Sequence, residues 1–174
     1  MTYPNEAAAC AAFADQVAAE FGPVAILVNN AGITRDNLLA RMKDAEWDEV
    51  IAVNLTGVFH CCQRGMAVMR DGGAIVSLGS IAALQGFYGQ ANYAAAKAGV
   101  QAMMRVISRE AARRGIRANA IAPGVIDTAM AATIPEDVRA AMLQNVPLGR
   151  FASLSTQEKE QPRLTGAAAV VRDR

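Results

Sequence analysis

Residues 74–97 read AIVSLGSIAALQGFYGQANYAAAK. The stretch opens with a short, continuous apolar run, Ala74 to Leu78, which is typical of a strand covered on both faces. A glycine-containing loop follows, and a helix is predicted from about Ala91 to Arg113, where Gly115 ends it. A buried strand followed by a long helix is the repeating unit of a parallel α/β sheet.

The same unit recurs on both sides of this stretch. An amphipathic helix is predicted over residues 5–21, a strand over 24–28, a long helix over about 46–69, and a last strand over 116–122 that Pro123-Gly124 terminates. Crossover connections of this length favour parallel strands. The sequence therefore predicts an α/β fold, a partial doubly wound parallel sheet of the Rossmann type.

Length and charge exclude several classes of protein. The 174 residues suit one domain, and 17 Lys and Arg against 16 Asp and Glu leave a net charge of +1. Such a balance gives no field that attracts nucleic acid or an anionic membrane. No apolar window reaches the ~18 residues of a membrane span, and the three cysteines form no C-x-x-C pair. We expect a soluble protein of a reducing cytoplasm.

The candidate reaction centre consists of Ser80, Tyr93 and Lys97. Tyr93 and Lys97 stand four residues apart on the predicted helix, so their side chains share one face. Ser80 follows the carboxyl end of a strand, where clefts form in open α/β sheets. A nearby ammonium favours the phenolate and brings a phenol with a pKa of about 10 toward working range. The serine hydroxyl can hold a carbonyl oxygen.

A Tyr-Lys pair of this spacing is also common as ordinary surface packing. The functional interpretation gains weight because polar or turn-forming motifs follow the other two strands as well, at Asn29 to Gly32 and at Pro123-Gly124. The single histidine, His60, and the neighbouring Cys61 and Cys62 have no partners in the sequence that indicate chemistry. We interpret those three residues as packing.

Taken together, these motifs resemble those of the short-chain dehydrogenase/reductase family, in the family's order. The resemblance covers about residues 5–151, and the stretch from Gly32 to Trp47 is most similar to the 3-oxoacyl-acyl-carrier-protein reductases within the family. It rests on Asn29-Asn30-Ala31-Gly32, Asn54-Leu55, Ser80, Tyr93 to Lys97, and Pro123-Gly124-Val125-Ile126-Asp127-Thr128.

The resemblance implies a role for each of four side chains. Tyr93 is the expected general acid for carbonyl reduction, and Lys97 is expected to lower the pKa of Tyr93 and to bind the nicotinamide ribose. Ser80 is expected to orient and polarise the carbonyl. Asn54 is expected to interrupt its helix and to hold a water that links Lys97 to solvent.

The resemblance also implies a nicotinamide cofactor, NADP or NAD, with NADP favoured on that ground alone. Direct hydride transfer needs no metal, and no metal-ligand cluster is evident in the sequence. The residues expected to contact the cofactor are Asn30, Ala31, Gly32, Tyr93, Lys97, Pro123, Gly124, Ile126 and Thr128.

The chain also departs from the family pattern. It has no G-x-G-x-x-G turn, and about sixty residues with two strands are missing before Tyr3 in comparison with the family. We therefore expect an incomplete Rossmann-like domain over residues 1–151, with an open hydrophobic edge at its first strand. Residues 127–150 are expected to form a helical lid over the cleft, and 152–174 a divergent, poorly ordered tail.

Two functions remain open from the sequence. The first is an NAD(P)H-dependent carbonyl reductase or alcohol dehydrogenase, most like the 3-oxoacyl-thioester reductases of fatty acid synthesis. Its substrate would be a small ketone or a 3-oxoacyl thioester, with an acyl carrier protein as one carrier, and a homo-oligomer is expected from the resemblance. The alternative is a catalytically silent fragment or subunit that acts by associating with a complete homologue.

Overall fold

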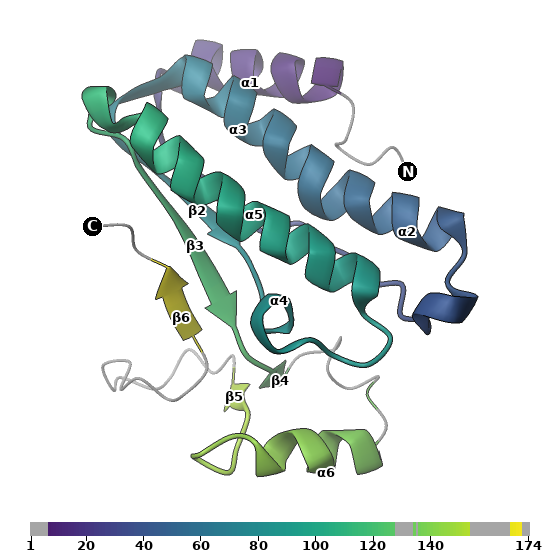
Figure 1. Ribbon diagram of the computed structural model, residues 1–174. Coiled ribbons are helices and arrows are strands. Elements are labelled where there is room, and N and C mark those ends of the chain that lie inside the picture. The colour runs from purple at the N-terminus through teal and green to yellow at the C-terminus, as the bar shows by residue number, and fades with distance from the viewer. Residues whose placement is uncertain (1–6, 128–133, 135, 154–167, 172–174) are drawn as a thin grey trace.

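The computed structural model describes residues 7–127, 134, 136–153 and 168–171 (Figure 1). Its main sheet has the strand order β1-β2-β3-β6, and β1, β2 and β3 are parallel to one another while β6 runs antiparallel to β3. The predicted α/β class with a parallel sheet is confirmed. The strands are β1 Val24–Asn29, β2 Met69–Leu78, β3 Arg117–Pro123 and β6 Ala168–Val171, and a separate pair joins β4 Ile126–Asp127 to β5 Ala152–Ser153.

The long helices lie in one layer on one face of the sheet (Figure 1). The predicted helix over 46–69 is α2, a π-helical turn and α3 in direct succession. The helices are α1 Ala7–Phe21, α2 Asp44–Ile51, the π-helical turn Ala52–Thr56, α3 Gly57–Val68, α4 Ala82–Gln85, α5 Ala91–Glu110 and α6 Glu136–Gln144.

The core lies between the parallel strands and this helical layer. Leu27, Ile75 and Ala118 are paired across β1, β2 and β3, and they face the helices. Val100 and Met104 of α5 pack onto the same row and are almost completely buried. Each large apolar side chain buried in this way contributes about 1.5–3 kcal/mol. The apolar runs of the sequence therefore become strands because helices cover them.

The opposite face of β1 is open. Ile26 and Val28 alternate with Leu27 along the strand, and they are 64% and 56% exposed. Among the strands that the structure describes, β1 pairs only with β2 and so forms the edge of the sheet. The predicted hydrophobic edge is confirmed.

Strand β2 is longer than the sequence indicates. The strand was expected from Ala74, and Asp71-Gly72-Gly73 before it is typical of a turn, but β2 begins at Met69 and runs through these residues. Gly72 adopts a φ of 75°, and a Cβ on Gly73 would lie only 3.1 Å from the carbonyl oxygen of Ala25. The glycine pair therefore lets β2 pass close to β1, with a register shift between Val24 and Ile26.

A short part of the segment expected to form the tail is a strand. Residues 168–171 form β6, which hydrogen-bonds to β3. The rest of the expected tail beyond Ser153 lies outside the described residues. The carboxyl ends of β1, β2 and β3 meet at one edge of the sheet, which is where binding sites form in open α/β folds.

Candidate functional site

Three side chains on successive turns of α5 lie at the end of β2, and two of them hydrogen-bond to the backbone there. Tyr93, Lys97 and Gln101 are four residues apart and share one face of the helix. Lys97 Nζ donates to the carbonyl oxygen of Leu78 at 2.6 Å, and Gln101 Nε2 donates to that of Ser80 at 3.1 Å. The Ser80 side chain lies close enough to the Tyr93 phenol to lower its pKa. The structure thus brings Ser80, Tyr93 and Lys97 together, as the sequence predicts.

Ser80 is held in place by the backbone around it. Its Oγ accepts a hydrogen bond from the Ala82 amide at 3.1 Å, at the start of α4. The amides of Gly79 and Ile81 donate to the carbonyl oxygens of Ile121 and Pro123, so the pairing with β3 continues past the end of β2. With the Ala82 amide on its oxygen, the hydroxyl has its proton to donate to Tyr93.

The environment of Tyr93 differs in one respect from the expectation. Burial raises the pKa of the phenol, the hydrogen bond from Ser80 opposes this rise, and the negative charge of Asp36 adds to it. The expected lowering by Lys97 is therefore not found, although Lys97 Nζ lies 5.7 Å from the centroid of the Tyr93 ring. Burial also lowers the pKa of Lys97 to about 8, which weakens its charge as a partner for a phenolate.

Asn54 lies in the π-helical turn Ala52–Thr56, so the expected local interruption of the helix is confirmed. Its Oδ1 accepts from the Ile33 amide and its Nδ2 donates to the Ile33 carbonyl oxygen, both at 2.8 Å. Such turns often occur at functional sites because they redirect one side chain. Here the turn fastens the loop after β1 to the helical layer.

Gly32 is the point at which this loop meets the reaction centre. A Cβ on Gly32 would lie 3.4 Å from Asn54 Oδ1 and 3.5 Å from Lys97 Nζ. The two side chains therefore flank the same glycine. A larger residue at Gly32 would occupy the space between them.

The other residues expected to bind a cofactor lie along the same edge of the sheet. Asn30 and Ala31 are exposed just after β1, and Pro123 and Gly124 are half-buried at the end of β3. Ile126 is half-buried in β4, whereas Thr128 lies outside the described residues.

Asn29, the first residue of that motif, has a structural role instead. Its Nδ2 donates to Ser77 Oγ of β2 at 3.0 Å and to Cys62 Sγ of α3 at 3.2 Å. The buried amide thereby ties β1 to β2 and to α3.

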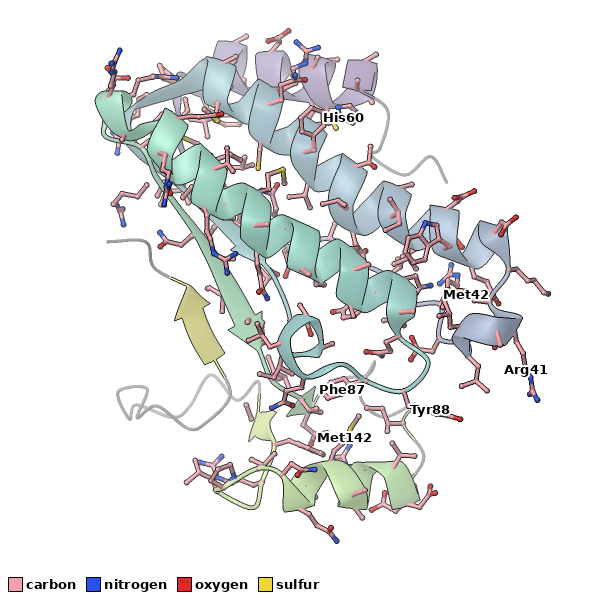
Figure 2. All side chains as sticks on the ribbon, in the orientation of Figure 1. Arg41, Met42, His60, Phe87, Tyr88 and Met142 are labelled. Atoms are coloured by element: carbon pink, nitrogen blue, oxygen red, sulfur yellow. The ribbon has the colours of Figure 1, made fainter. Side chains whose placement is uncertain are left out.

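A small cavity lies beside Ser80, beneath α6. It has a volume of about 110 Å³, and it is lined by Ile81 and Phe87 from the segment after Ser80, by Gly124, and by Met142 of α6. Phe87 and Met142 lie near each other at this end of the molecule (Figure 2). The helical segment predicted for the lid is confirmed over Glu136–Gln144, and α6 contributes to the walls of this cavity.

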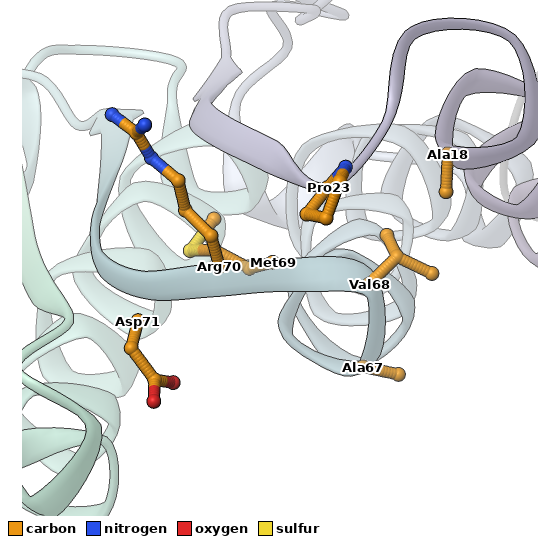
Figure 3. Close-up of a pocket in the computed structure, with 7 residues that line it drawn as sticks. All are labelled: Ala18, Pro23, Ala67, Val68, Met69, Arg70 and Asp71. Atoms are coloured by element: carbon orange, nitrogen blue, oxygen red, sulfur yellow. The ribbon is translucent and has the colours of Figure 1, made fainter.

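A second hollow lies at the opposite end of the strands (Figure 3). Pro23, Met69 and Asp71 line it, where α1 leads into β1 and α3 leads into β2. It is open to solvent, and it contains none of the predicted site residues. We therefore assign it no part in the chemistry.

Gln101 and Asn92 are two positioning side chains that the sequence motifs did not indicate. Asn92 is completely buried beside Tyr93. Asn92 Nδ2 donates to the carbonyl oxygens of Arg35 and Glu46 at 3.0 Å each, and its Oδ1 accepts from the Tyr93 amide. The only signal in the sequence was an amide residue in the first turn of the helix, next to the tyrosine.

His60 remains a residue without an assigned chemical role. Its ring contacts that of Phe59, and its buried Nδ1 has no hydrogen-bond partner. Within the described ranges, no group of three or more His, Cys, Asp or Glu residues is arranged to hold a metal ion. No helix in the part of the chain that the structure describes is long and apolar enough to cross a membrane.

Comparison with known proteins decides the family. The sequence model described as short chain dehydrogenase matches residues 4–139, most of the chain. The chain belongs to the short-chain dehydrogenase family. This assignment confirms the resemblance that the sequence motifs indicate, and it agrees with the partial Rossmann-type sheet.

Two family members that are similar to this chain carry the same name, FabG. The 3-oxoacyl-acyl-carrier-protein reductase FabG of Escherichia coli (strain K12) is 50% identical over 139 residues, which cover 79% of this chain and 57% of the relative. FabG of Staphylococcus epidermidis (strain RP62A) is 50% identical over 138 residues, 78% of this chain and 57% of the relative. The chain thus spans a little over half the length of these relatives.

Proposed function

We propose that this site reduces a ketone to a secondary alcohol with a nicotinamide cofactor. The observation that carries the proposal is that three groups converge: the Ser80 side chain lies close enough to the Tyr93 phenol to lower its pKa, and Lys97 lies on the same face of α5. Two hydroxyl groups at one point can both donate to a single carbonyl oxygen. The membership of the family and the FabG relatives support the same chemistry.

Tyr93 is the proton donor in this proposal. Burial raises the pKa of its phenol, so the group carries its proton at neutral pH, as a general acid must. As the carbonyl oxygen gains negative charge, Tyr93 transfers its proton to that oxygen while Ser80 keeps the oxygen in place. The Lys97 ammonium stabilises the phenolate that remains.

Lys97 and Asn54 form, in this proposal, part of a relay that returns a proton from solvent to Tyr93 after the reaction. Lys97 Nζ has three N–H donors, of which the Leu78 carbonyl takes one. Asn54 Oδ1 has a second lone pair besides the one that accepts from Ile33. Both groups flank Gly32, and a water held there would connect them to solvent.

The residues present fit the nicotinamide half of NADPH or NADH. Lys97 has donors left for ribose hydroxyls, and Gly32 leaves open the space beside it. When bound, the cofactor supplies the hydride that reduces the carbonyl carbon. The phosphate half has less support in this chain, because its sequence lacks a G-x-G-x-x-G turn. We propose NADP over NAD only because the FabG-like resemblance favours it.

The proposed substrate is a 3-oxoacyl thioester. The names of the relatives point to such substrates on an acyl carrier protein. The cavity whose walls include Ile81, Phe87 and Met142 begins at the residue after Ser80, and we propose that it receives a short acyl chain. We propose the acyl carrier protein as the carrier and a homo-oligomer as the working form, both by analogy with these relatives.

Titration with NADPH and NADH tests the proposal first, because the single tryptophan of the chain, Trp47, reports binding through its fluorescence. The purified chain is then assayed with 3-oxobutanoyl thioester for NADPH consumption at 340 nm. We expect nucleotide binding and NADPH consumption, both reduced in a Lys97→Met variant.

Micromolar binding of either nucleotide contradicts the alternative, a catalytically silent fragment. Absence of both binding and turnover overturns the proposal and favours a partner of a complete homologue.

A further inference from the structure

Two cysteines that are far apart in the sequence meet between α1 and α3. Cys10 Sγ lies 3.9 Å from Cys61 Sγ, and 51 positions separate the two residues. Cys10 is 6% exposed, Cys61 is half-buried, and both are reduced thiols in the structure. The two helices pack against each other along this contact (Figure 1).

We propose that Cys10 and Cys61 form an oxidation site, in which a disulfide links α1 to α3. The sulfur atoms of a disulfide are about 2.05 Å apart, so they must approach by roughly 2 Å. Rotation of the two side chains and a small shift of α1 can provide that movement. This proposal does not depend on the proposed function.

The oxidant in the proposal is a small disulfide such as oxidised glutathione. The Cys61 thiolate attacks one sulfur of the oxidant, and one glutathione thiolate leaves. The Cys10 thiolate then attacks Cys61 Sγ in the mixed disulfide and releases the second glutathione. The protein loses two protons and two electrons, and the oxidant becomes two thiols. Cys61 reacts first because it is the less buried of the pair.

The environment of Cys61 makes this reaction slow at neutral pH. Burial, and then the neighbouring thiol of Cys10, raise the pKa of Cys61 to about 11, with a smaller effect from Cys62. The thiolate that attacks is therefore scarce at pH 7 and more abundant at pH 9. The other ionisable side chains of α3 are His60, which precedes Cys61, and Arg64, which lies three residues after it. The site suits slow, lasting oxidation and not rapid peroxide sensing.

Cys62 provides a control within the same helix. Consecutive residues of an α-helix point about 100° apart, and Cys62 faces the sheet, where its Sγ accepts from Asn29 Nδ2. It is 1% exposed and belongs to the core cluster. Cys62 is therefore not expected to join the disulfide.

The disulfide would close a loop that contains all of β1. That loop also contains the Gly32 and Asn54 segments of the candidate site. Cross-linking a loop of this length restricts the unfolded chain and raises the melting temperature. We expect the oxidised form to melt about 5 °C or more above the reduced form.

Peptide mapping tests the site directly. The chain is incubated with oxidised glutathione at pH 9, denatured, alkylated and digested with trypsin. Cys10 then lies in the peptide 1–35, and Cys61 and Cys62 lie in 44–64. We expect these two peptides to be joined in the wild type and in Cys62→Ser, and separate in Cys10→Ser and Cys61→Ser. Three alkylated thiols, a disulfide within 44–64, or cross-links between chains would each overturn the proposal.

The melting temperature supplies a second measurement. We expect a rise on oxidation in the wild type and in Cys62→Ser that dithiothreitol reverses. A joined pair of peptides with an unchanged or lower melting temperature would contradict the proposed bridge between α1 and α3 in the folded protein.

Discussion

The Nε2 atom of Gln101 donates a hydrogen bond to the carbonyl oxygen of Ser80, two turns of α5 away from Tyr93. Gln101 is only 3% exposed, and a Cβ on Gly79 would lie 2.9 Å from the same Nε2 atom. The absence of a side chain at Gly79 therefore lets the glutamine reach the strand end. One helix thus carries the proposed acid and also fixes the serine that faces it.

Replacing Gln101 is expected to impair the site more than the fold. Gln101→Leu leaves the buried Ser80 carbonyl without its donor, at a cost of about 1–3 kcal/mol in the free energy of unfolding. If the proposed function holds, kcat should fall by about tenfold with little change in KM, because Ser80 acts in the transition state. Ser108→Ala on the same helix removes only a local hydrogen bond to the Arg105 carbonyl and serves as the control. An unchanged kcat in a folded Gln101→Leu protein argues against the positioning role.

The buried ammonium of Lys97 makes stability depend on pH in a defined window. Its pKa of about 8 in the folded protein lies below the ordinary value of 10.5. Between these pH values the unfolded chain binds a proton that the folded chain does not, so this group makes folding more favourable as the pH rises. Lys97→Met lacks the effect, so the difference in unfolding free energy between the two proteins should change by about 3 kcal/mol from pH 8 to 10.5.

Urea titrations at several pH values measure this difference. Tyr93, Cys61 and Cys62 also titrate at alkaline pH, but both proteins contain them, so their contributions cancel. Parallel stability curves for wild type and variant across the window would show that Lys97 keeps an ordinary pKa.

Two adjacent asparagines should respond very differently to the same substitution. Asn29→Ala removes the buried link from β1 to Ser77 and Cys62, and we expect a loss of about 2–3 kcal/mol in the free energy of unfolding. Asn30→Ala changes an exposed side chain and should stay within about 0.5 kcal/mol of the wild type. Equal effects in denaturant titrations would contradict the structural role assigned to Asn29.

The open face of β1 should promote self-association. Ile26→Lys places a charge on an exposed position of the edge strand, and we expect less light scattering on heating without loss of helical circular dichroism. Leu27→Lys is the contrasting variant, because Leu27 packs against the core and its replacement should unfold the protein. Unchanged scattering in Ile26→Lys would mean that this edge does not drive association.

Much of the fold can be predicted because the parallel strands that pack under helices have continuous apolar sequences, even where one face is open as in β1. The runs at 24–28 and 74–78 correspond to β1 and to the carboxyl half of β2. The amino half of β2 was missed because a Gly-Gly pair ordinarily indicates a turn. Here it permits close passage of β2 beside β1, while Arg114 donates to the Met66 and Met69 carbonyls and caps the end of α3.

The candidate site could be predicted only in part, because some of its features depend on contacts to the backbone and on burial. Ser80, Tyr93 and Lys97 follow from the spacing on α5 and the end of β2, and the resemblance supplied Asn54. Gln101 and Asn92 donate hydrogen bonds to backbone carbonyl oxygens. Every residue type has such an oxygen, so these contacts leave no pattern in the sequence. The direction of the Tyr93 pKa is set first by burial, which the spacing of Tyr93 and Lys97 in the sequence does not show.

The most direct test of the proposed reduction compares two tyrosines that receive the same change. Tyr93 lies beside Ser80, which lowers the pKa of its phenol, whereas Tyr88, five residues earlier, is 90% exposed. NADPH consumption with 3-oxobutanoyl thioester is measured for the wild type, Tyr93→Phe and Tyr88→Phe, with circular dichroism to verify folding. The proposed mechanism predicts at least a ~100-fold loss of kcat in Tyr93→Phe and wild-type activity in Tyr88→Phe. Equal activity in all three proteins, or none in the wild type, would contradict it.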